Sequence, residues 1–171
     1  MKGFIELNVK TLKENVFRNF DNEWTLVTAG NKDSFNTMTA SWGSMGILWN
    51  RPIAICFVRP QRYTHKFTES SDYFTLSFFE EKYRDILNYC GSVSGKNYDK
   101  IKETGLIPVY SLKGNIGFSQ ARLIFECRKL YADYLKAENF IVKEVISRHY
   151  PKSDFHRFYI GEIEACYSKK Y

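Results

Sequence analysis

The sequence lacks the features that mark secreted, membrane-spanning and metal-binding proteins. Residues 1–16 alternate apolar with charged side chains and contain no long apolar run, so they do not resemble a signal peptide. The longest strongly apolar run, Ile53–Val58, is far shorter than the roughly 18 residues that span a bilayer. Only three histidines are present, without an HExxH motif or a Cys/His cluster. We therefore expect a cytoplasmic protein with no membrane contact and no metal site.

Cysteine pairs and nucleotide-binding motifs are also missing. The four cysteines are widely spaced, which favours reduced structural thiols over a redox pair: Cys56, Cys90, Cys127 and Cys166. No GxGxxG motif is present, and Gly91–Asn97 is one residue too short for a phosphate loop. A Gly-x-Ser-x-Gly elbow is absent as well. These absences disfavour the common nucleotide folds and the serine hydrolases.

Aromatic and basic side chains are what the sequence has in excess. The 171 residues include 14 Phe, 12 Tyr and 3 Trp, and 25 basic against 19 acidic side chains give a net charge of +6. A chain of this length suits one domain, so we expect a single domain over residues 1–171. A small basic protein rich in aromatics suits two functions, binding of nucleic acid or binding of a flat anionic cofactor.

The hydrophobic pattern predicts a mainly β protein, a β-barrel with helical additions. We expect strands at 24–29, 36–42, 53–58, 73–79, 117–131 and 155–167, the first two forming a hairpin. Short helices are expected at 64–70, 80–90 and 98–104, and weaker ones at 134–139 and 141–149, with Thr64 capping the first and Gly91 ending the second. Residues 43–50 are expected to form a loop in which Ile47, Leu48 and Trp49 are buried.

The turn from Arg59 to Thr64 is a candidate phosphate site. Arg59 and Arg62 offer forked donors that fit phosphate oxygens, and a helix is expected to begin beside them. A solvated basic turn explains the same residues equally simply, so the local pattern leaves both interpretations open.

The strand Asn36–Trp42 is a second candidate site. Its alternation places the hydroxyl residues Thr37, Thr39 and Ser41 on one face and Met38, Ala40 and Trp42 on the other. Hydroxyls could form hydrogen bonds with the polar rim of a flat ring, and Met38 or Trp42 could pack near that ring. A half-solvated strand is the alternative, since Thr is a good strand former.

Five segments in order resemble the flavin reductase-like family, and its flavoredoxin-type members in particular. The resemblance runs from about Trp24 to Ile163, and the five segments within it are Asn36–Gly43, Arg51–Pro52, Val58–Thr64, Val93–Lys100 and His156–Ile163. The resemblance implies the FMN-binding split β-barrel fold and non-covalent FMN at a homodimer interface. It also implies an NAD(P)H:flavin reductase or a flavoredoxin-like electron carrier, with NADH or NADPH as co-substrate and a redox protein as a further partner.

The resemblance implies a role for each segment. The strand 36–42 would lie along the flavin ring and ribityl chain, the turn 59–64 would take the phosphate, and Lys96 or Lys100 would add positive charge. His156 would approach the nicotinamide or flavin region, with a structural surface histidine as its alternative, and no protein acid or base is obligatory for hydride transfer. The cofactor-binding residues expected are Asn36, Thr37, Met38, Thr39, Ala40, Ser41, Trp42, Arg59, Arg62, Tyr63, Thr64, Lys96 and Lys100.

Two other functions remain open at the level of sequence. One is a basic, aromatic-rich β-barrel that binds nucleic acid without enzymatic activity, although the basic residues are scattered instead of clustered. The other keeps the barrel but gives it haem or another cofactor. The sequence does not choose between NADH and NADPH.

Overall fold

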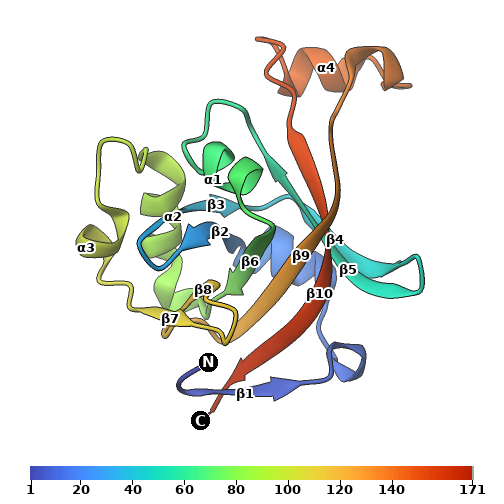
Figure 1. The fold of residues 1–171 in the computed structure, drawn as a ribbon. Helices are drawn as coiled ribbons and strands as arrows, with labels where there is room; N and C mark the ends of the chain where they lie inside the picture. The colour runs from blue at the N-terminus through green and yellow to red at the C-terminus, as the bar shows by residue number, and fades with distance from the viewer. Residues whose placement is uncertain (171) are drawn as a thin grey trace.

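The computed structural model describes residues 1–170 and consists mainly of antiparallel strands (Figure 1). Eight of the strands form one sheet, in the order β3-β2-β6-β9-β10-β5-β4 with β1 added to β10. Their bounds are β1 Phe4–Leu7, β2 Thr25–Asn31, β3 Ser34–Ala40, β4 Gly43–Leu48, β5 Arg51–Val58, β6 Tyr73–Phe78, β9 Leu123–Tyr134 and β10 Arg157–Lys169. A separate hairpin joins β7 Pro108–Tyr110 to β8 Ile116–Phe118.

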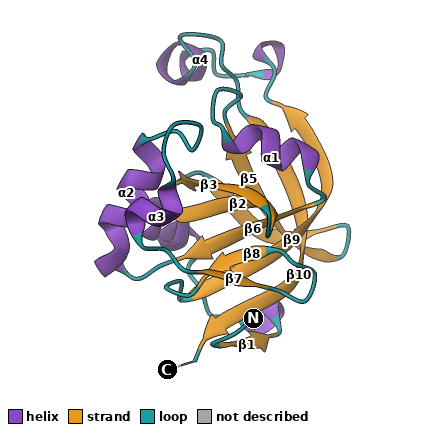
Figure 2. Ribbon diagram, turned by 60° about the vertical axis from the view of Figure 1, so that its left-hand side comes forward, coloured by secondary structure: helices purple, strands orange, loops and turns teal. Residues whose placement is uncertain are grey.

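Short helices lie outside this sheet (Figure 2). α2 and α3 lie together on one side, α1 lies near β2 and β3, and α4 stands at the far end of β9 and β10. The α-helices are α1 Thr64–Ser70, α2 Arg84–Ser92, α3 Lys100–Thr104 and α4 Glu144–His149. Single turns occupy Val9–Thr11, Glu81–Tyr83 and Ala137–Asn139, and a π-helical turn occupies Arg18–Glu23.

Each face of the curved sheet is covered by its own apolar core. The first core lies within the curve and includes Met38, Cys56, Phe74 and Phe125. The second lies between the opposite face and the β7–β8 hairpin with α2, and includes Leu87 and Phe118. Mostly antiparallel strands, two cores and few helices confirm the β-barrel fold class with helical additions. The four cysteines are all buried and unpaired, as expected of structural thiols.

The β2–β3 hairpin is confirmed, but the loop expected at 43–50 is wrong. β4 pairs with β5 from Gly43 opposite Cys56 to Leu48 opposite Arg51, and Trp49 and Asn50 form a two-residue turn. Both turn residues have positive φ, 51° and 59°, as a type I′ turn requires. Because this turn lacks the usual Asn-Gly signal, the sequence hides the hairpin. The expected burial is also wrong, since Ile47 is 63% and Trp49 is 57% exposed.

Several helix boundaries differ from those expected. Thr64 is the first residue of α1 and does not cap it, because its hydroxyl accepts a hydrogen bond from Asn36. α2 continues through Gly91 to Ser92, and the expected helix at 134–139 is reduced to a single turn because β9 extends to Tyr134. The short strands β1 and β7 were not expected.

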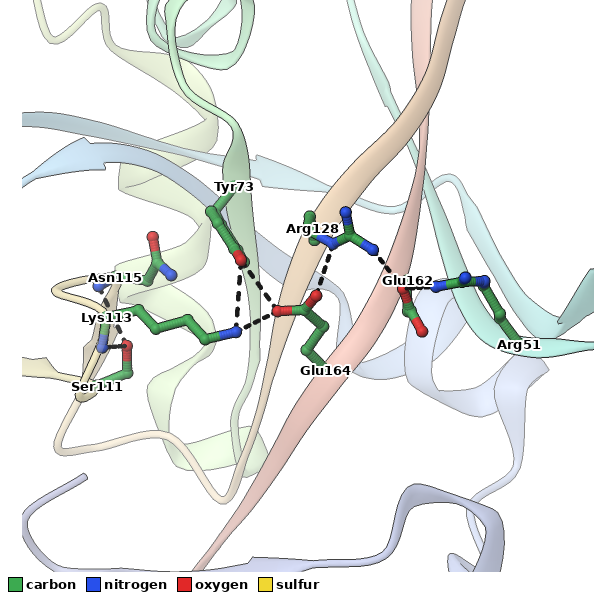
Figure 3. Close-up of polar contacts among 8 residues, drawn as sticks. All are labelled: Arg51, Tyr73, Ser111, Lys113, Asn115, Arg128, Glu162 and Glu164. Atoms are coloured by element: carbon green, nitrogen blue, oxygen red, sulfur yellow. Dashed lines mark hydrogen bonds and ion pairs between the residues drawn. The ribbon is translucent and has the colours of Figure 1, made fainter.

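A ladder of alternating charges crosses β5, β10 and β9 on the outer face of the sheet (Figure 3). Arg51 donates to Glu162 at 2.5 Å, and Arg128 donates to Glu162 at 3.0 Å and to Glu164 at 2.6 Å. Glu164 also pairs with Lys113 of the β7–β8 loop and accepts from the Tyr73 hydroxyl at 3.0 Å. The ladder thereby ties the small hairpin to the barrel.

Candidate functional site

Three adjoining cavities follow β3 and the turn that precedes α1. Cavity A, of about 240 Å³, is lined by Met38–Trp42, Phe57, Arg59, Arg62 and His156. Cavity B, of about 130 Å³, shares Arg62 with cavity A and is lined by residues 61–64, 91–95 and Lys100. Cavity C, of about 340 Å³, shares Gly95 and Lys100 with cavity B and is lined by residues 35–37 and 95–101. Together they bring most of the expected site residues side by side, although the expected segments lie far apart in the sequence.

Cavity A has aromatic walls at the end of β3. The ring centroid of Trp42 lies 5.0 Å from that of His156, and Phe57 lies 6.3 Å from His156 on the neighbouring strand. His156 is 8% exposed, and its Nδ1 shares a 2.9 Å hydrogen bond with the Tyr150 hydroxyl. Burial and, to a smaller extent, the charge of Arg59 lower the pKa of His156 to about 4. His156 is therefore a neutral, buried wall of the cavity at neutral pH.

Arg59 lines cavity A, but its guanidinium is engaged by protein groups. Its Nη1 pairs with Asp154, and its Nη2 donates to the carbonyl of His149 at 2.8 Å. It also stacks over the Tyr150 ring, 5.3 Å from the centroid. Arg59 thus holds the segment before β10 against the barrel. Of the two arginines expected to bind phosphate, only Arg62 lines cavity B.

Cavity B contains two cations with no carboxylate partner. The Nζ of Lys100 donates to the carbonyls of Cys90 at 2.7 Å and Thr37 at 2.8 Å, and Arg62 Nη2 donates to the Cys90 carbonyl at 3.4 Å. Within residues 1–170, neither cation forms an ion pair. Burial lowers the pKa of both side chains, that of Lys100 to about 8. A desolvated positive pair of this kind is stabilised by an anion.

A close backbone approach shapes the boundary between cavities B and C. Asn36 Nδ2 donates to Thr64 Oγ1 at 2.7 Å, which ties β3 to the start of α1. A Cβ on Gly95 would lie 1.9 Å from Oδ1 of Asn36, so any other residue there would displace the Asn36 amide or the loop. Gly95 is therefore a site residue that was not singled out from the sequence, although it lies in a segment that resembled the family.

The hydroxyls of β3 do not point to a ring as expected. Thr37 Oγ1 lies 2.9 Å from Thr28 Oγ1, and Thr39 Oγ1 donates to the Leu87 carbonyl at 2.5 Å. Met38 and Ala40 belong to the first core. Of the three hydroxyl residues, Ser41 is the one with no intramolecular hydrogen bond among residues 1–170, and it lines cavity A. β3 lies at the edge of the sheet, where its one neighbouring strand is β2. The backbone N–H and C=O groups on its open side are therefore the donors and acceptors that remain for a ligand.

The other two expected residues lie at the rims. Tyr63 lines cavity B, and its hydroxyl accepts from Lys66 at 2.7 Å. Lys96 is exposed and lines cavity C. The sequence did not single out Phe57 and Tyr150, which form part of the walls of the site.

A fourth, larger cavity adjoins cavity A. This cavity D, of about 760 Å³, shares Ser41, Trp42 and Phe57 with cavity A. Its further lining is mostly apolar and includes Phe17, which is 85% exposed, and Phe20. No basic side chain among the described residues lines it, which suits an uncharged ligand or an apolar surface.

Other kinds of site are not seen in the described part of the chain. No three His, Cys, Asp or Glu side chains within residues 1–170 are grouped so that they could hold a metal ion. None of the helices in that range has the length and apolar character needed to cross a membrane.

Comparison with known proteins identifies the family. Flavoredoxin from Methanosarcina acetivorans is 24% identical with a TM-score of 0.66, covering 97% of this chain and 75% of its own. The FMN-binding protein from Thermus thermophilus with bound p-hydroxybenzaldehyde is 18% identical with a TM-score of 0.68, covering 96% and 81%. The NADH:FAD oxidoreductase of Streptomyces globisporus C-1027 is 16% identical with a TM-score of 0.67, covering 90% and 79%. These likenesses show a shared fold, while no curated protein matches the sequence.

The sequence itself also matches one family along most of its length. The match is to the flavin reductase like domain and covers residues 17–170, which include the whole lining of cavities A, B and C and all of cavity D except Val16. The fold, the cavities beside β3 and this match lead to one conclusion: the chain belongs to the flavin reductase-like family.

Proposed function

We propose that this chain is an FMN-binding oxidoreductase that takes electrons from NADH or NADPH, as a single domain over residues 1–171. Cavities A and B together form a groove. The observation that carries the proposal is the pair of carboxylate-free cations at its cavity B end, half-buried Arg62 and buried Lys100, opposite the aromatic walls of cavity A. FMN has a phosphate at one end and a flat ring at the other, so its two ends match the two ends of the groove.

The residues of the groove fit the cofactor. Arg62 and Lys100 would neutralise the phosphate in cavity B, where Gly95 keeps the space beside Asn36 open. Trp42, Phe57 and His156 would bound the ring in cavity A. Ser41 and the edge of β3 would supply polar contacts to the ring and the ribityl chain. Lys96 would add positive charge from the rim of cavity C.

The chemistry of the reaction would belong to the cofactor. Bound FMN supplies a ring that accepts a hydride and passes electrons on. The protein binds and orients the ring, excludes water with the Trp42 and Phe57 walls, and supplies a fixed polar environment from the β3 edge. His156 is neutral and bonded to Tyr150, so we assign it a positioning role and no proton transfer.

A flavoredoxin-like electron carrier is the second candidate within the same fold. The observation that favours it is the absence of any basic side chain lining cavity D, because a pyridine nucleotide carries a diphosphate that cations would neutralise. A carrier would exchange electrons with a protein partner and would not need such a cation.

The test is rapid-mixing reduction of purified, FMN-loaded protein by NADH and by NADPH. A yellow protein that is bleached in under a second by one nucleotide supports the reductase. Slow reduction by both, with fast reduction by a redox protein, supports the carrier. A protein that neither carries flavin nor takes up added FMN contradicts both, and salt-sensitive binding to DNA or RNA would then support the nucleic-acid alternative.

A matched pair of glycine variants tests the location of the site. Gly95→Ala places a Cβ 1.9 Å from Asn36, so the loop must shift, and we expect FMN affinity to fall by about tenfold or more. Gly46→Ala in β4 meets no atom within 4 Å and should leave the affinity unchanged. Fluorescence titration of apoprotein with FMN measures both. Equal affinities in the two variants would place the flavin elsewhere.

A further inference from the structure

Lys100 is the most deeply buried cation of the groove. It is 4% exposed, begins the short helix α3, and lines both cavity B and cavity C. An ammonium group has three donors, and two of them are used by the carbonyls of Cys90 and Thr37. Those two carbonyls belong to α2 and β3, so one charged group joins three elements at the end of the groove.

Lys100 forms no ion pair with a carboxylate within residues 1–170. From the turn before α1 it faces Arg62, and from α2 it faces Cys90, whose thiol is kept neutral because burial raises its pKa to about 11. β3 presents Asn36 and Thr37, which do not ionise. On its own side, Asp99 accepts from the backbone N–H groups of Ile101 and Lys102, and Lys96 lies on the exposed rim.

This arrangement is unfavourable until an anion arrives. Two carbonyl dipoles stabilise an ammonium less than a carboxylate does, and the neighbouring guanidinium of Arg62 repels it. A phosphate monoester is a dianion above about pH 6 and would reverse both effects. A flavin without phosphate would leave the cations as they are.

We propose that Lys100 makes this site select a phosphorylated flavin over riboflavin, and that it takes up a proton with the phosphate at alkaline pH. This inference rests on the proposed function, since it assumes that flavin binds in the groove. It adds the residue that discriminates the phosphate and predicts a linkage between binding and protonation.

The direction of the pH dependence follows from the charge states. In the flavin-free protein the pKa of Lys100 is about 8, chiefly through burial, and a bound dianion raises it. Binding is therefore strongest below pH 8, where Lys100 is already charged, and weakens as the pH rises and the proton must be supplied from solution. Riboflavin has the same ring, so any ionisation of the ring affects both ligands equally. The ratio of the FMN affinity to the riboflavin affinity therefore reports the contribution of the phosphate alone.

The experiment measures that ratio on apoprotein by flavin fluorescence from pH 7 to pH 9.5 at constant ionic strength. For the unaltered chain we expect it to fall about tenfold between pH 7 and pH 9. Calorimetry at pH 8.5 in buffers of different ionisation enthalpy should show uptake of more than about half a proton with FMN and none with riboflavin.

Three variants make the test specific. Lys100→Arg keeps its charge at all these pH values, so its ratio should stay high and flat. Lys100→Met should have a low, flat ratio, and its riboflavin affinity shows that the groove is folded. Lys102→Met removes an exposed cation from the same helix and should follow the unaltered chain.

Two results would overturn the proposal. One is a flat ratio without proton uptake in the unaltered chain, and the other is an undiminished fall in Lys100→Arg. Either would leave flavin binding itself intact. Failure of both flavins to bind at every pH would instead refute the proposed function.

Discussion

Trp42 and His156 illustrate how single residues define the groove. Trp42 separates cavity A from cavity D and is held between the rings of His156, at 5.0 Å, and His149, at 5.5 Å. His156 is fixed in turn by the Tyr150 hydroxyl. The ring end of the site therefore depends on an uncharged imidazole, because a proton on His156 would be poorly solvated and close to Arg59.

This dependence predicts a loss of stability in mild acid. The pKa of His156 is about 4 in the fold against about 6.5 unfolded, so its contribution is complete above pH 6.5 and is lost as the pH falls toward 4. Between pH 7 and pH 4.5 we expect the unaltered chain to lose roughly 2 kcal/mol more unfolding free energy than His156→Gln, measured by urea denaturation. An equal loss in both proteins would show that another group carries the acid sensitivity.

Arg59 and Arg62 show what the sequence could predict of the site and what it could not. Both lie on one turn, three residues apart, and both were expected to bind phosphate. Only the fold brings Asp154, which is 95 residues away in the chain, to Arg59, leaving Arg62 as the arginine that lines cavity B. Local spacing located the turn correctly, but long-range pairing decided which guanidinium is engaged.

At the scale of elements, one arginine fastens the N-terminal segment to the barrel. Arg122, at the start of β9, donates to Glu14 at 2.9 and 3.0 Å and to Glu23 at 2.5 and 3.0 Å. It also donates to Asn19 at 3.2 Å. These partners flank the π-helical turn whose Phe20 packs in the first core and lines cavity D. The network therefore positions one wall of the region beside the groove.

Removing this cation should loosen the segment. Arg122→Gln leaves Glu14 without an ion-pair partner and Glu23 with only the exposed Arg18, so we expect a loss of about 2–3 kcal/mol in unfolding free energy and faster tryptic cleavage after Lys13 and Arg18. Arg18→Gln removes the exposed pair with Glu23 and should change stability by less than about 0.5 kcal/mol. Similar losses in the two variants, measured by urea denaturation, would contradict the fastening role of Arg122.

Elements were predictable where alternation and turn signals agreed. The β2–β3 hairpin follows from alternating residues around Gly30–Ser34, and α3 ends at Thr104, the last residue of the helix expected at 98–104, with Gly105 in a left-handed conformation after it. β4 was missed because exposed Ile47 and Trp49 look like core residues, and its Trp49-Asn50 turn carries no glycine. A half-exposed strand is recognised by apolar residues that alternate with polar ones, and apolar side chains that remain exposed obscure this alternation.

For the whole molecule, the exposed apolar residues of the β4–β5 hairpin suggest how two chains associate. The hairpin projects from the barrel on the side away from β7 and β8 (Figure 1). Apolar exposure on a projecting hairpin is typical of an interface, and β4 leads directly from Trp42 in cavity A. By contrast, nine basic side chains within residues 1–170 take part in ion pairs with carboxylates, so these nine are not free to bind an external polyanion.

We therefore expect a homodimer that uses this hairpin. Sedimentation equilibrium should give the mass of two chains. The double variant Ile47→Ser, Trp49→Ser should give mainly monomer with weaker FMN binding, because each substitution removes apolar surface that the dimer would bury. Leu112→Ser, which changes a fully exposed apolar side chain in the β7–β8 loop, should remain dimeric. A monomeric unaltered chain with full FMN affinity would contradict the shared site.

β10 has a consequence for how the protein is made. It pairs with β1, β5 and β9, so β1 obtains its partner, and β5 and β9 their second neighbour, only when residues 157–169 are present. During translation these residues leave the ribosome after all three partners. The nascent chain must therefore carry β5 and β9 with open edges until synthesis reaches β10, a period in which chaperones would protect it from aggregation. Barrel closure, and with it a complete groove, therefore has to wait until β10 has been synthesised.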